Sequence, residues 1–415
     1  MNIRTKILID RIAGTPLLAV LNAALSLVPA RKRPASFRTI IVCKLIGMGS
    51  IIQAGALLQS LRLSYPHARI VFLTTKSNES LLSHMAMVDE ALTIDDRTVA
   101  ALLSTTLRAL FTIRARRFDL FLDLEVYARF ASILAALSGA RQRDGFFKGS
   151  PNHGRGIYSH LVYFNIKAPI KDAYLQLARV AGCKELSAAI PGLAIVPRDR
   201  SAIADVLRSR GCGPQRRIVV VNPNASGLRI ERRWKHANFT DLITRVIKRF
   251  PGRTIILTGS PSERGHVAKI FTGIEQPLRD SVLDLSGLLS TGELIALIEV
   301  CELLITNDTG PMHIAAAIGT KTVALFGPCA PEQYGVAENV VPFYKNVYCS
   351  PCVHEFEVPP CNGNNHCMQA IGVDEVFDAV ASILMGGNLP RELRTPIRYT
   401  ATDGSSPLGL VNGKR

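Results

Sequence analysis

The sequence predicts an alternating α/β fold that is divided into two domains. From Arg38 onward, short apolar runs alternate with longer stretches of helical periodicity, a pattern typical of parallel sheets covered by helices. The chain has 415 residues and exceeds one ordinary domain, so two domains of roughly 150–200 residues are expected. Hydrophobic residues make up 47% of the chain, which is enough for a sizeable core in each domain.

The predicted elements of the first half follow one another in strand–helix order. Strands are predicted at 39–45, 69–73 and 119–124, and helices at 51–63 and 99–113. Between the first strand and helix lies the turn Gly47-Met48-Gly49-Ser50. A strand-to-helix turn that contains glycines lets a ligand approach the backbone, although this pattern alone is a weak signal.

A second unit is predicted after the proline-bearing segment 191–197. Apolar strands are expected at 218–221, 254–257 and 303–306 and at 322–326, and a helix at 373–384. Residues 387–415 form a polar tail that contains proline, glycine and serine.

The stretch from Leu303 to Pro328 carries the strongest functional pattern. An apolar run ends in Asn307-Asp308-Thr309-Gly310, and a proline then occupies the first position of a small-residue helix that contains His313. Such a turn directs the backbone N–H groups of a helix N-terminus toward the carboxyl edge of a parallel sheet, where phosphate binds well. The alternative is an ordinary crossover helix with a buried histidine.

Two carboxylates mark the end of the strand predicted at 119–124. Asp123 and Glu125 alternate with apolar residues where α/β sheets place ligand-binding groups. Side chains two residues apart in a strand point the same way, so mutual repulsion would raise one pKa and make a better base. We favour Glu125 as that base. In the alternative, Glu125 lies at the start of the next helix and pairs with Arg129.

The net charge of +16 indicates an anionic partner, which could be nucleic acid, acidic lipid or a phosphorylated substrate. Nucleic acid is the weakest candidate, because the sequence contains no zinc finger, RNP-type aromatic pattern or basic helix run. The positive residues Arg141, Lys148, His153 and Arg155 offer charge to a phosphorylated or acidic lipid-linked sugar, although each alone is typical of a solvated surface.

Residues 1–37 combine basic flanks with an uncharged run from Ala13 to Ala30. A signal peptide, a transmembrane helix, an interfacial helix on an anionic leaflet and a helix packed on the protein's own surface all fit this composition. We favour the interfacial helix, because the run is short, contains Pro16 and Asn22, and is flanked by basic residues.

Four of the nine cysteines lie close together in the sequence, at Cys349, Cys352, Cys361 and Cys367. Their spacing fits zinc, an iron–sulfur cluster, two disulfides or free thiols. The other five cysteines are scattered, which suits a reducing cytoplasm. In that compartment a loop at 349–367 that is rich in proline, glycine and asparagine favours a structural Zn²⁺ site.

The segment Asn307-Asp308-Thr309-Gly310-Pro311-Met312-His313, together with Leu325-Phe326-Gly327-Pro328, resembles glycosyltransferase family 9, the ADP-heptose:lipopolysaccharide heptosyltransferases. The resemblance extends, more weakly, over residues 38–383. It implies the GT-B architecture, in which two Rossmann-like domains face a central cleft. It also implies that Asp308, Thr309, Gly310 and His313 hold the diphosphate and sugar of a nucleotide-sugar donor.

The resemblance suggests further donor-binding residues in the second half. Asn222 to Trp234 is similar to the family's turn with a small hydroxyl residue followed by a basic residue and tryptophan. By that match Ser226 bonds the donor phosphate and Arg232, rather than Arg233, neutralises it. The family match places Glu263 on the ribose hydroxyls, whereas its sequence position also fits a helix cap.

The family usually has an aspartate where this chain has Ser50, and that aspartate is thought to deprotonate the acceptor. Serine cannot take a proton at neutral pH without its own base, so Glu125 or Asp123 is expected to replace it. The alternatives are an inactive homologue that still binds a nucleotide sugar, and a transferase that uses another donor.

The resulting prediction is an inverting transferase that needs no cofactor for catalysis. It moves a sugar, favoured as heptose from ADP-heptose, to an anionic lipid-linked or lipopolysaccharide-core glycan at the cytoplasmic face of the bacterial inner membrane. Residues 38–195 form the acceptor domain and residues 196–386 the nucleotide-sugar domain, and residues 1–37 associate with the membrane surface.

Overall fold

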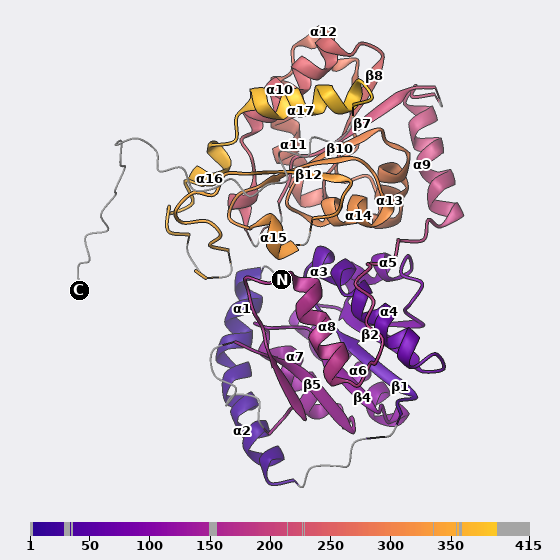
Figure 1. Ribbon diagram of the computed structural model, residues 1–415, viewed down its shortest axis with the longest axis vertical. Coiled ribbons are helices and arrows are strands. Elements are labelled where there is room, and N and C mark those ends of the chain that lie inside the picture. Colours follow the sequence, from indigo (N-terminus) through magenta and orange to yellow (C-terminus); the bar gives the residue numbers. More distant parts are fainter. Residues whose placement is uncertain are drawn as a thin grey trace, which may run out of the picture.

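Two parallel sheets of six strands form the framework of the protein (Figure 1). The computed structural model describes residues 3–28, 34, 36–148, 156–213, 215–225, 227, 229–334, 336–353, 355–356 and 359–387. The strand orders are β3-β2-β1-β4-β5-β6 and β12-β11-β10-β7-β8-β9, so each sheet reverses its winding between its first and fourth strands. Each half of the chain therefore forms a doubly wound α/β unit, as the alternating pattern predicted.

The first sheet is covered by helices on both faces. Along β1, Ile40 and Val42 point toward the side covered by α3, α4 and α8, and Ile41 and Cys43 point toward the side covered by α6 and α7. The strands are Thr39–Cys43 (β1), Arg69–Thr75 (β2), Glu90–Ile94 (β3), Leu120–Asp123 (β4), Gln142–Phe147 (β5) and His160–Tyr163 (β6). The helices are Met48–Gln53 (α3), Gly55–Ser64 (α4), Glu79–Leu82 (α5), Val99–Arg116 (α6), Arg129–Leu137 (α7) and Ile170–Val180 (α8).

The second sheet has the same construction, with α10, α11 and α17 on one face and α9, α13 and α14 on the other. Its strands are Arg217–Asn222 (β7), Arg253–Leu257 (β8), Val282–Asp284 (β9), Leu303–Asn307 (β10), Thr322–Phe326 (β11) and Val340–Tyr344 (β12). Its longer helices are Pro197–Ser209 (α9), His236–Arg249 (α10), Arg264–Gly273 (α11), Thr291–Val300 (α13), Gly310–Ile318 (α14) and Val373–Leu384 (α17). Its short helices are Gln276–Arg279 (α12), Pro331–Tyr334 (α15) and His366–Gln369 (α16).

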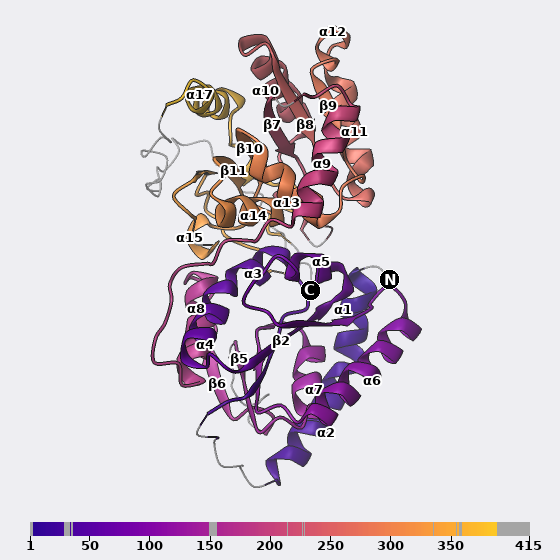
Figure 2. The same cartoon turned by 90° about the vertical axis from the view of Figure 1, so that its right-hand side faces the viewer.

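The apolar core is continuous between the two units. One buried cluster contains Ile51 and Leu57 of the first unit and Ile295 and Ile314 of the second. Helix α3 packs against α14, and α5 packs against α13, so the carboxyl edges of the two sheets face each other (Figures 1 and 2). This contact determines which groups line the space between the sheets.

The N-terminal residues form a nearly continuous helix, α1 (Ile3–Ile12) followed by α2 (Gly14–Ser26), which packs on α7. The Asp10 carboxylate accepts hydrogen bonds from the backbone N–H groups of Arg129 (3.1 Å) and Phe130 (2.7 Å), so it caps α7 from outside. By length and composition, residues 5–26 could cross a membrane. In the structure the helix instead lies along the protein's own surface and exposes its outer side.

Several element boundaries differ from the sequence prediction. The strand predicted at 39–45 ends at Cys43, and the helix predicted at 51–63 begins at Met48 and is interrupted at Ala54. The helix predicted at 99–113 continues to Arg116, whereas 373–384 has the predicted bounds. The predicted tail lies outside the described residues, apart from Gly387.

Replacing Asp10 with alanine tests whether the N-terminal helix is part of the folded domain. The variant Asp10→Ala should lower the free energy of unfolding by about 1 kcal/mol, because it removes the cap of α7. The measurement is urea denaturation followed by circular dichroism. The control Asp205→Ala removes an exposed carboxylate paired with Arg208 and should change stability by less than about 0.5 kcal/mol. Equal stability of the two variants would contradict the capping role.

Candidate active site

The candidate residues lie at the two points where the winding of the sheets reverses. In the first sheet, Cys43 at the end of β1 pairs with Asp123 at the end of β4. In the second sheet, β7 runs beside β10, so the segments after Asn222 and Asn307 leave the same edge. Ligands of doubly wound sheets bind outside the carboxyl ends of the strands at these points. The two points therefore define one candidate site on each side of the domain contact.

The strand, turn, helix and strand predicted around Asp308 are present as β10, α14 and β11. Thr309 precedes α14 in extended conformation, and Gly319, with φ of +94°, ends the helix in the left-handed region. The buried Asn307 amide donates to the Asn224 carbonyl (3.0 Å), and its oxygen accepts from the Trp234 backbone N–H (3.2 Å). These bonds fix the turn after β7 against the N-terminus of α14.

Asp308 is the most unusual polar group in the second domain. Its carboxylate is 1% exposed, and neither oxygen has a hydrogen-bond partner among the described residues. The Arg232 Nη1 atom lies 3.7 Å from its Oδ2 atom. A buried carboxylate without hydrogen bonds is costly, and such groups are typical of ligand-binding sites.

Arg232 connects Asp308 to a group that the sequence patterns did not indicate. It follows Ile230 and Glu231 in a short 3₁₀ helix, donates to the Tyr334 hydroxyl (3.3 Å), and keeps an unpartnered Nε atom in the described part of the chain. The Tyr334 hydroxyl in turn donates to the Cys329 thiol (3.7 Å). Arg232 is therefore fixed beside the N-terminus of α14, and its Nε–H group can still donate a hydrogen bond to a ligand.

His313 lies in the first turn of α14 and is 3% exposed. Burial lowers the pKa of its imidazole to about 4, with the positive charge of Arg232 acting in the same direction and the Asp308 carboxylate opposing it. The ring is therefore neutral at physiological pH. Its Nδ1 atom lies 3.4 Å from the Gln53 Nε2 atom of α3, so the other domain orients it.

The glycine turn after β1 allows this close approach between the domains. A Cβ atom added to Gly49 would lie 2.2 Å from the His313 ring, and one added to Gly310 would lie 2.7 Å from the Met48 sulfur. Gly47 adopts φ of +96° immediately before α3. In the structure Gly49 makes room for His313 of α14, and the approach of a ligand to this turn stays a prediction.

Two other predicted donor residues have different outcomes. Ser226 lies outside the described residues. Glu263 accepts from the Ser260 backbone N–H and hydroxyl, both at 2.8 Å, and so completes a capping box before α11. It also lies 3.9 Å from Arg233. The capping role exists in the structure, and contact with a ribose stays a prediction.

Glu125 is held in the first domain by groups from the end of β1. Its Oε1 atom accepts from the backbone N–H groups of Leu45 (2.8 Å) and Ile46 (3.0 Å) and lies 2.8 Å from the Lys44 ammonium group. Its Oε2 atom takes part in none of these bonds and is not among the buried atoms left without a partner in the described residues, and the side chain as a whole is 7% exposed. The expected pair with Arg129 does not form, because Arg129 lies beside Asp10 at the far end of the loop.

Asp123 occupies a different environment from Glu125. Its oxygens accept from the Tyr158 hydroxyl (2.6 Å) and the Glu125 backbone N–H (2.9 Å), and the side chain is 1% exposed. Burial raises the pKa of Asp123 to about 7, and repulsion by Glu125 adds a smaller contribution. The predicted rise in one pKa therefore falls on Asp123, the last residue of β4, whereas the base that we favoured is Glu125.

Ser50 lies near this group, in α3. Its hydroxyl is hydrogen-bonded to the buried Tyr174 hydroxyl, and burial raises the pKa of Tyr174 to about 12. Tyr174 therefore stays protonated at neutral pH and cannot act as a base for Ser50.

An open cavity of about 750 Å³ is lined by residues of both domains. Lys148 and Lys167 give it positive charge, and the exposed ring of Tyr163 packs on Phe147 with 5.7 Å between ring centres. Glu355 of the cysteine-bearing loop lies on its opposite side. His153 and Arg155, which were also expected near an acceptor, lie outside the described residues.

The four clustered cysteines do not form a metal site in the structure. All nine cysteines are described and none forms a disulfide, and no group of three or more His, Cys, Asp or Glu side chains in the described ranges could hold a metal ion. Burial, followed by nearby thiols, raises the pKa of Cys352 to about 11 and that of Cys367 to about 12. These two thiols are therefore protonated at neutral pH, and the geometry of the described residues gives zinc no support.

The fold defines a class of protein: two doubly wound α/β domains whose carboxyl sheet edges face each other, as in the GT-B architecture. The family model for "Glycosyltransferase family 9 (heptosyltransferase)" matches residues 107–361. The chain belongs to glycosyltransferase family 9, and it is therefore a glycosyltransferase.

Individual relatives agree with this assignment. Lipopolysaccharide heptosyltransferase 2 of Escherichia coli K12 is 24% identical over 299 residues, which cover 69% of this chain and 81% of that protein. The crystal structure of a family 9 glycosyltransferase from Veillonella parvula superposes with a TM-score of 0.73 at 22% identity, covering 85% of this chain and 99% of the other. The structure of E. coli ADP-heptose lipopolysaccharide heptosyltransferase II superposes with a TM-score of 0.69 at 19% identity, covering 84% of this chain and 99% of the other. The predicted GT-B fold is confirmed.

The contact between Gly49 and His313 can be tested by adding one methyl group. Gly49→Ala should reduce stability by about 1–3 kcal/mol, because α3 or the buried imidazole must move. The midpoint of thermal unfolding measures this effect. The control is Gly265→Ala in α11, where an added Cβ atom meets nothing within 4 Å and helix propensity favours alanine. A Gly49→Ala midpoint equal to that of the control would contradict the close approach.

The zinc hypothesis has a direct test in the metal content of the purified protein. The structure leads us to expect less than about 0.1 Zn²⁺ per chain and nine thiols that react with a thiol reagent after unfolding. One tightly held Zn²⁺ per chain, lost together with thiol protection in Cys352→Ser, would show that the loop rearranges around metal.

Proposed function

We propose that this protein is an inverting heptosyltransferase that moves heptose from ADP-heptose to a lipopolysaccharide-core or other lipid-linked glycan. The observation that carries the proposal is the buried carboxylate of Asp308 at the N-terminus of α14, which pairs with Arg232 at 3.7 Å but accepts no hydrogen bond among the described residues. Family membership fixes the class of reaction. The names of the relatives, lipopolysaccharide heptosyltransferase and ADP-heptose lipopolysaccharide heptosyltransferase, support the donor and the acceptor class.

The donor site would use three kinds of group around α14. Thr309 and Gly310 are half-buried at the start of the helix, where backbone N–H groups and the helix dipole favour phosphate. Arg232 would neutralise the charge that the leaving diphosphate gains in the transition state. The Asp308 oxygens would accept hydrogen bonds from hydroxyl groups of the donor, which removes the cost of their present burial. Neutral His313 can donate or accept without adding charge.

Donor entry requires movement of the domain contact. Gln53 covers His313 and donates to the Tyr334 carbonyl (2.9 Å), so α3 lies directly over the donor-binding groups. Separation of α3 from α14 would admit the nucleotide, and closure over it would exclude water from the reacting centre. Ser226 and Glu263 would complete the donor site, on the phosphate and the ribose respectively.

Glu125 is our proposed general base in place of the family's aspartate. The three bonds to Oε1 fix the carboxylate at the carboxyl edge of the first sheet, while Oε2 is left to accept a proton from the acceptor hydroxyl. Asp123 is less suited to that role, because both of its oxygens are hydrogen-bonded and it is almost fully buried. Asp123 would instead position the backbone N–H of Glu125.

The acceptor is proposed to lie in the cavity formed with Lys148 and Lys167. Two ammonium groups would bind phosphate or carboxylate groups of a core glycan, and the exposed ring of Tyr163 offers an apolar face to a sugar ring. The reaction would take place at the cytoplasmic face of the inner membrane, since its acceptor is anchored in lipid. We propose that neither proton removal from the acceptor nor transfer of the sugar uses a metal ion or cofactor.

The central experiment is a transfer assay with ADP-heptose and a lipid-linked core acceptor, comparing wild type with Glu125→Gln. The amide preserves the size of the side chain but cannot take a proton, so kcat should fall about 10²–10⁴-fold. Binding of ADP should change less than about threefold, because Glu125 lies in the other domain. Loss of ADP binding to the same degree as kcat would show a structural defect instead.

Two controls sharpen this assay. Asp123→Asn should lower kcat less than Glu125→Gln, since Asp123 does not reach the acceptor. Glu185→Gln changes an exposed carboxylate in the interdomain segment and should leave kcat unchanged. A wild-type protein that binds ADP but transfers no sugar would favour the inactive homologue, and turnover with a different nucleotide sugar would replace the proposed donor.

A further inference from the structure

The long helix α6 exposes an apolar stripe that the proposed reaction does not use. Val99, Leu103, Leu107 and Phe111 recur at every fourth position, with exposed fractions of 49%, 60%, 68% and 76%. Residues at this spacing form one continuous strip along a helix. On the opposite side of α6, Ala109 and Ile113 are buried against the first sheet. The stripe is therefore a second apolar face, which faces away from the core.

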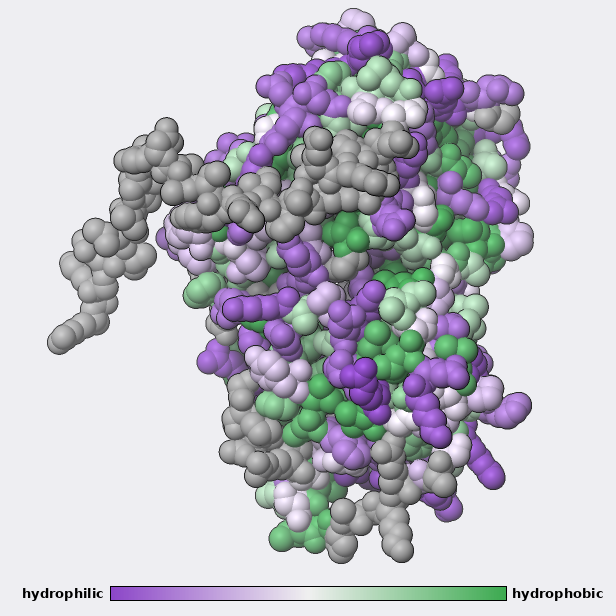
Figure 3. Space-filling view, viewed as in Figure 1, coloured by the Kyte–Doolittle hydropathy of each residue, from purple (hydrophilic) through white to green (hydrophobic). Residues whose placement is uncertain are grey.

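The stripe belongs to a larger apolar surface. Helices α1, α2, α6 and α7 all lie on the same side of the first sheet (Figure 2). The Lys6 ammonium group lies 2.5 Å from the Asp96 carboxylate, which links α1 to the segment just before α6. The outer side of α1 and α2 exposes Leu8, Ile12 and Val20. In Figure 3 the hydrophobic surface at the lower end of the molecule lies over α2.

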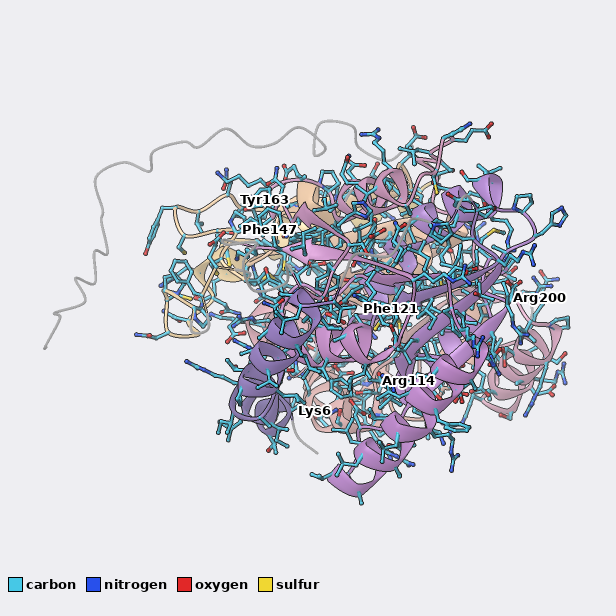
Figure 4. The ribbon with its side chains drawn as sticks, turned by 90° about the horizontal axis from the view of Figure 1, so that it is seen from below. Lys6, Arg114, Phe121, Phe147, Tyr163 and Arg200 are labelled. Carbon is cyan, nitrogen blue, oxygen red and sulfur yellow. The ribbon has the colours of Figure 1, made fainter. Side chains whose placement is uncertain are left out.

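Basic residues accompany this surface. Helix α6 contains Arg108, Arg114 and Arg116 and no acidic residue, and Arg117 follows it directly. All four arginines are exposed. Among the nearby acids, Asp10 caps α7, Asp96 pairs with Lys6, and Glu90 pairs with Arg116 at 2.7 Å. Arg108, Arg114 and Arg117 therefore carry most of the positive charge of the surface. Figure 4 shows Lys6 of α1 and Arg114 of α6 on the same side of the first domain, away from Tyr163 and Phe147.

We propose that α6, together with the outer side of α1 and α2, is a docking surface for an anionic lipid bilayer. An apolar strip bordered by arginines is the composition of interfacial helices, whose apolar side chains enter the boundary between headgroups and acyl chains. Arginine near such a surface gains about 1 kcal/mol from anionic lipid. Neutral lipid or a second copy of this basic chain would lack that charge complementarity.

The position of the surface fits a lipid-linked acceptor. The helix α1 reaches the boundary between the two domains, so a bilayer against α1, α2 and α6 would lie beside the open edge of the site (Figures 1 and 2). A glycan anchored in that bilayer could then extend into the first domain. The role of docking in bringing the enzyme to a lipid-linked acceptor rests on the proposed function. The docking itself depends only on the surface, and it is tested without donor or acceptor.

The test is sedimentation of the full-length protein with two kinds of vesicle. One is pure phosphatidylcholine, and the other also contains about 30% of the anionic lipid phosphatidylglycerol. The variant Leu107→Glu/Phe111→Glu places two acids in the centre of the stripe. The wild type should bind anionic vesicles and bind at least tenfold more weakly to neutral ones or in high salt. The double variant should lose tenfold or more of its affinity for anionic vesicles.

A matched control separates this stripe from general hydrophobicity. Leu63→Glu/Leu288→Glu removes two leucines that are 48% and 50% exposed on α4 and in the loop before α13, and should bind vesicles like the wild type. ADP binding and the thermal midpoint should be equal in all three proteins, which shows that the variants fold.

Three outcomes would overturn the inference. The stripe variant could bind anionic vesicles as tightly as the wild type, which would assign membrane binding to α1 and α2 alone. The wild type could fail to bind vesicles at all. Analytical ultracentrifugation could show a dimer that only the stripe variant disrupts, and the surface would then be an interface between copies. Failure of ADP binding with intact vesicle binding would count against the proposed function and not against docking.

Discussion

The close approach of α3 and α14 is the constraint on which the arrangement of the site depends. The two helices can touch because Gly49 and Gly310 carry no side chain where they meet His313 and Met48. This contact joins the carboxyl edges of the two sheets, covers the buried Asp308 carboxylate and brings Gln53 of one domain onto His313 of the other. The same glycine turn that resembles a ligand-binding loop thus serves to bring one domain against the other.

Near Ser50, where the family usually has an aspartate, the first domain places a carboxylate that comes from another strand. Ser50 is hydrogen-bonded to Tyr174, whose raised pKa keeps it protonated, so this pair does not supply a base. Glu125 enters the same region from the end of β4 and is fixed through one oxygen by three donors at 44–46. Holding one oxygen while leaving the other unbonded is a physical requirement for a positioned base. The nearby Asp123 has no unbonded oxygen and serves as support.

The sequence predicted best those helices and strands that have both a clear apolar periodicity and clear signals at their ends. The helix at 373–384 and the strand–turn–helix at 303–318 combine apolar periodicity with clear end signals, and both are present. Strands β3, β5, β6 and β9 were not predicted, because they are short or only partly apolar and are stabilised by neighbours in the sheet.

The side-chain partners were harder to predict, because they come from distant parts of the chain. The alternative role for Glu125 was a pair with Arg129 four residues away, but Arg129 meets Asp10, and Glu125 meets Lys44. Tyr334 and Cys329 join the donor-site cluster through the fold of the segment after β11, and no spacing in the sequence marks them. The chemical character of Asp308 was predictable, whereas its burial without a partner was visible only in the structure.

Calorimetric titration of ADP, set against UDP, GDP and CDP, tests the donor assignment most directly. The account predicts that ADP binds with clear preference, and that Arg232→Ala weakens this binding roughly 10- to 100-fold, the value of a lost charged hydrogen bond to phosphate. Equal binding of all four nucleotides would remove the support for an adenine nucleotide donor. Absence of nucleotide binding, or full ADP affinity in Arg232→Ala, would contradict the proposed donor site at the N-terminus of α14.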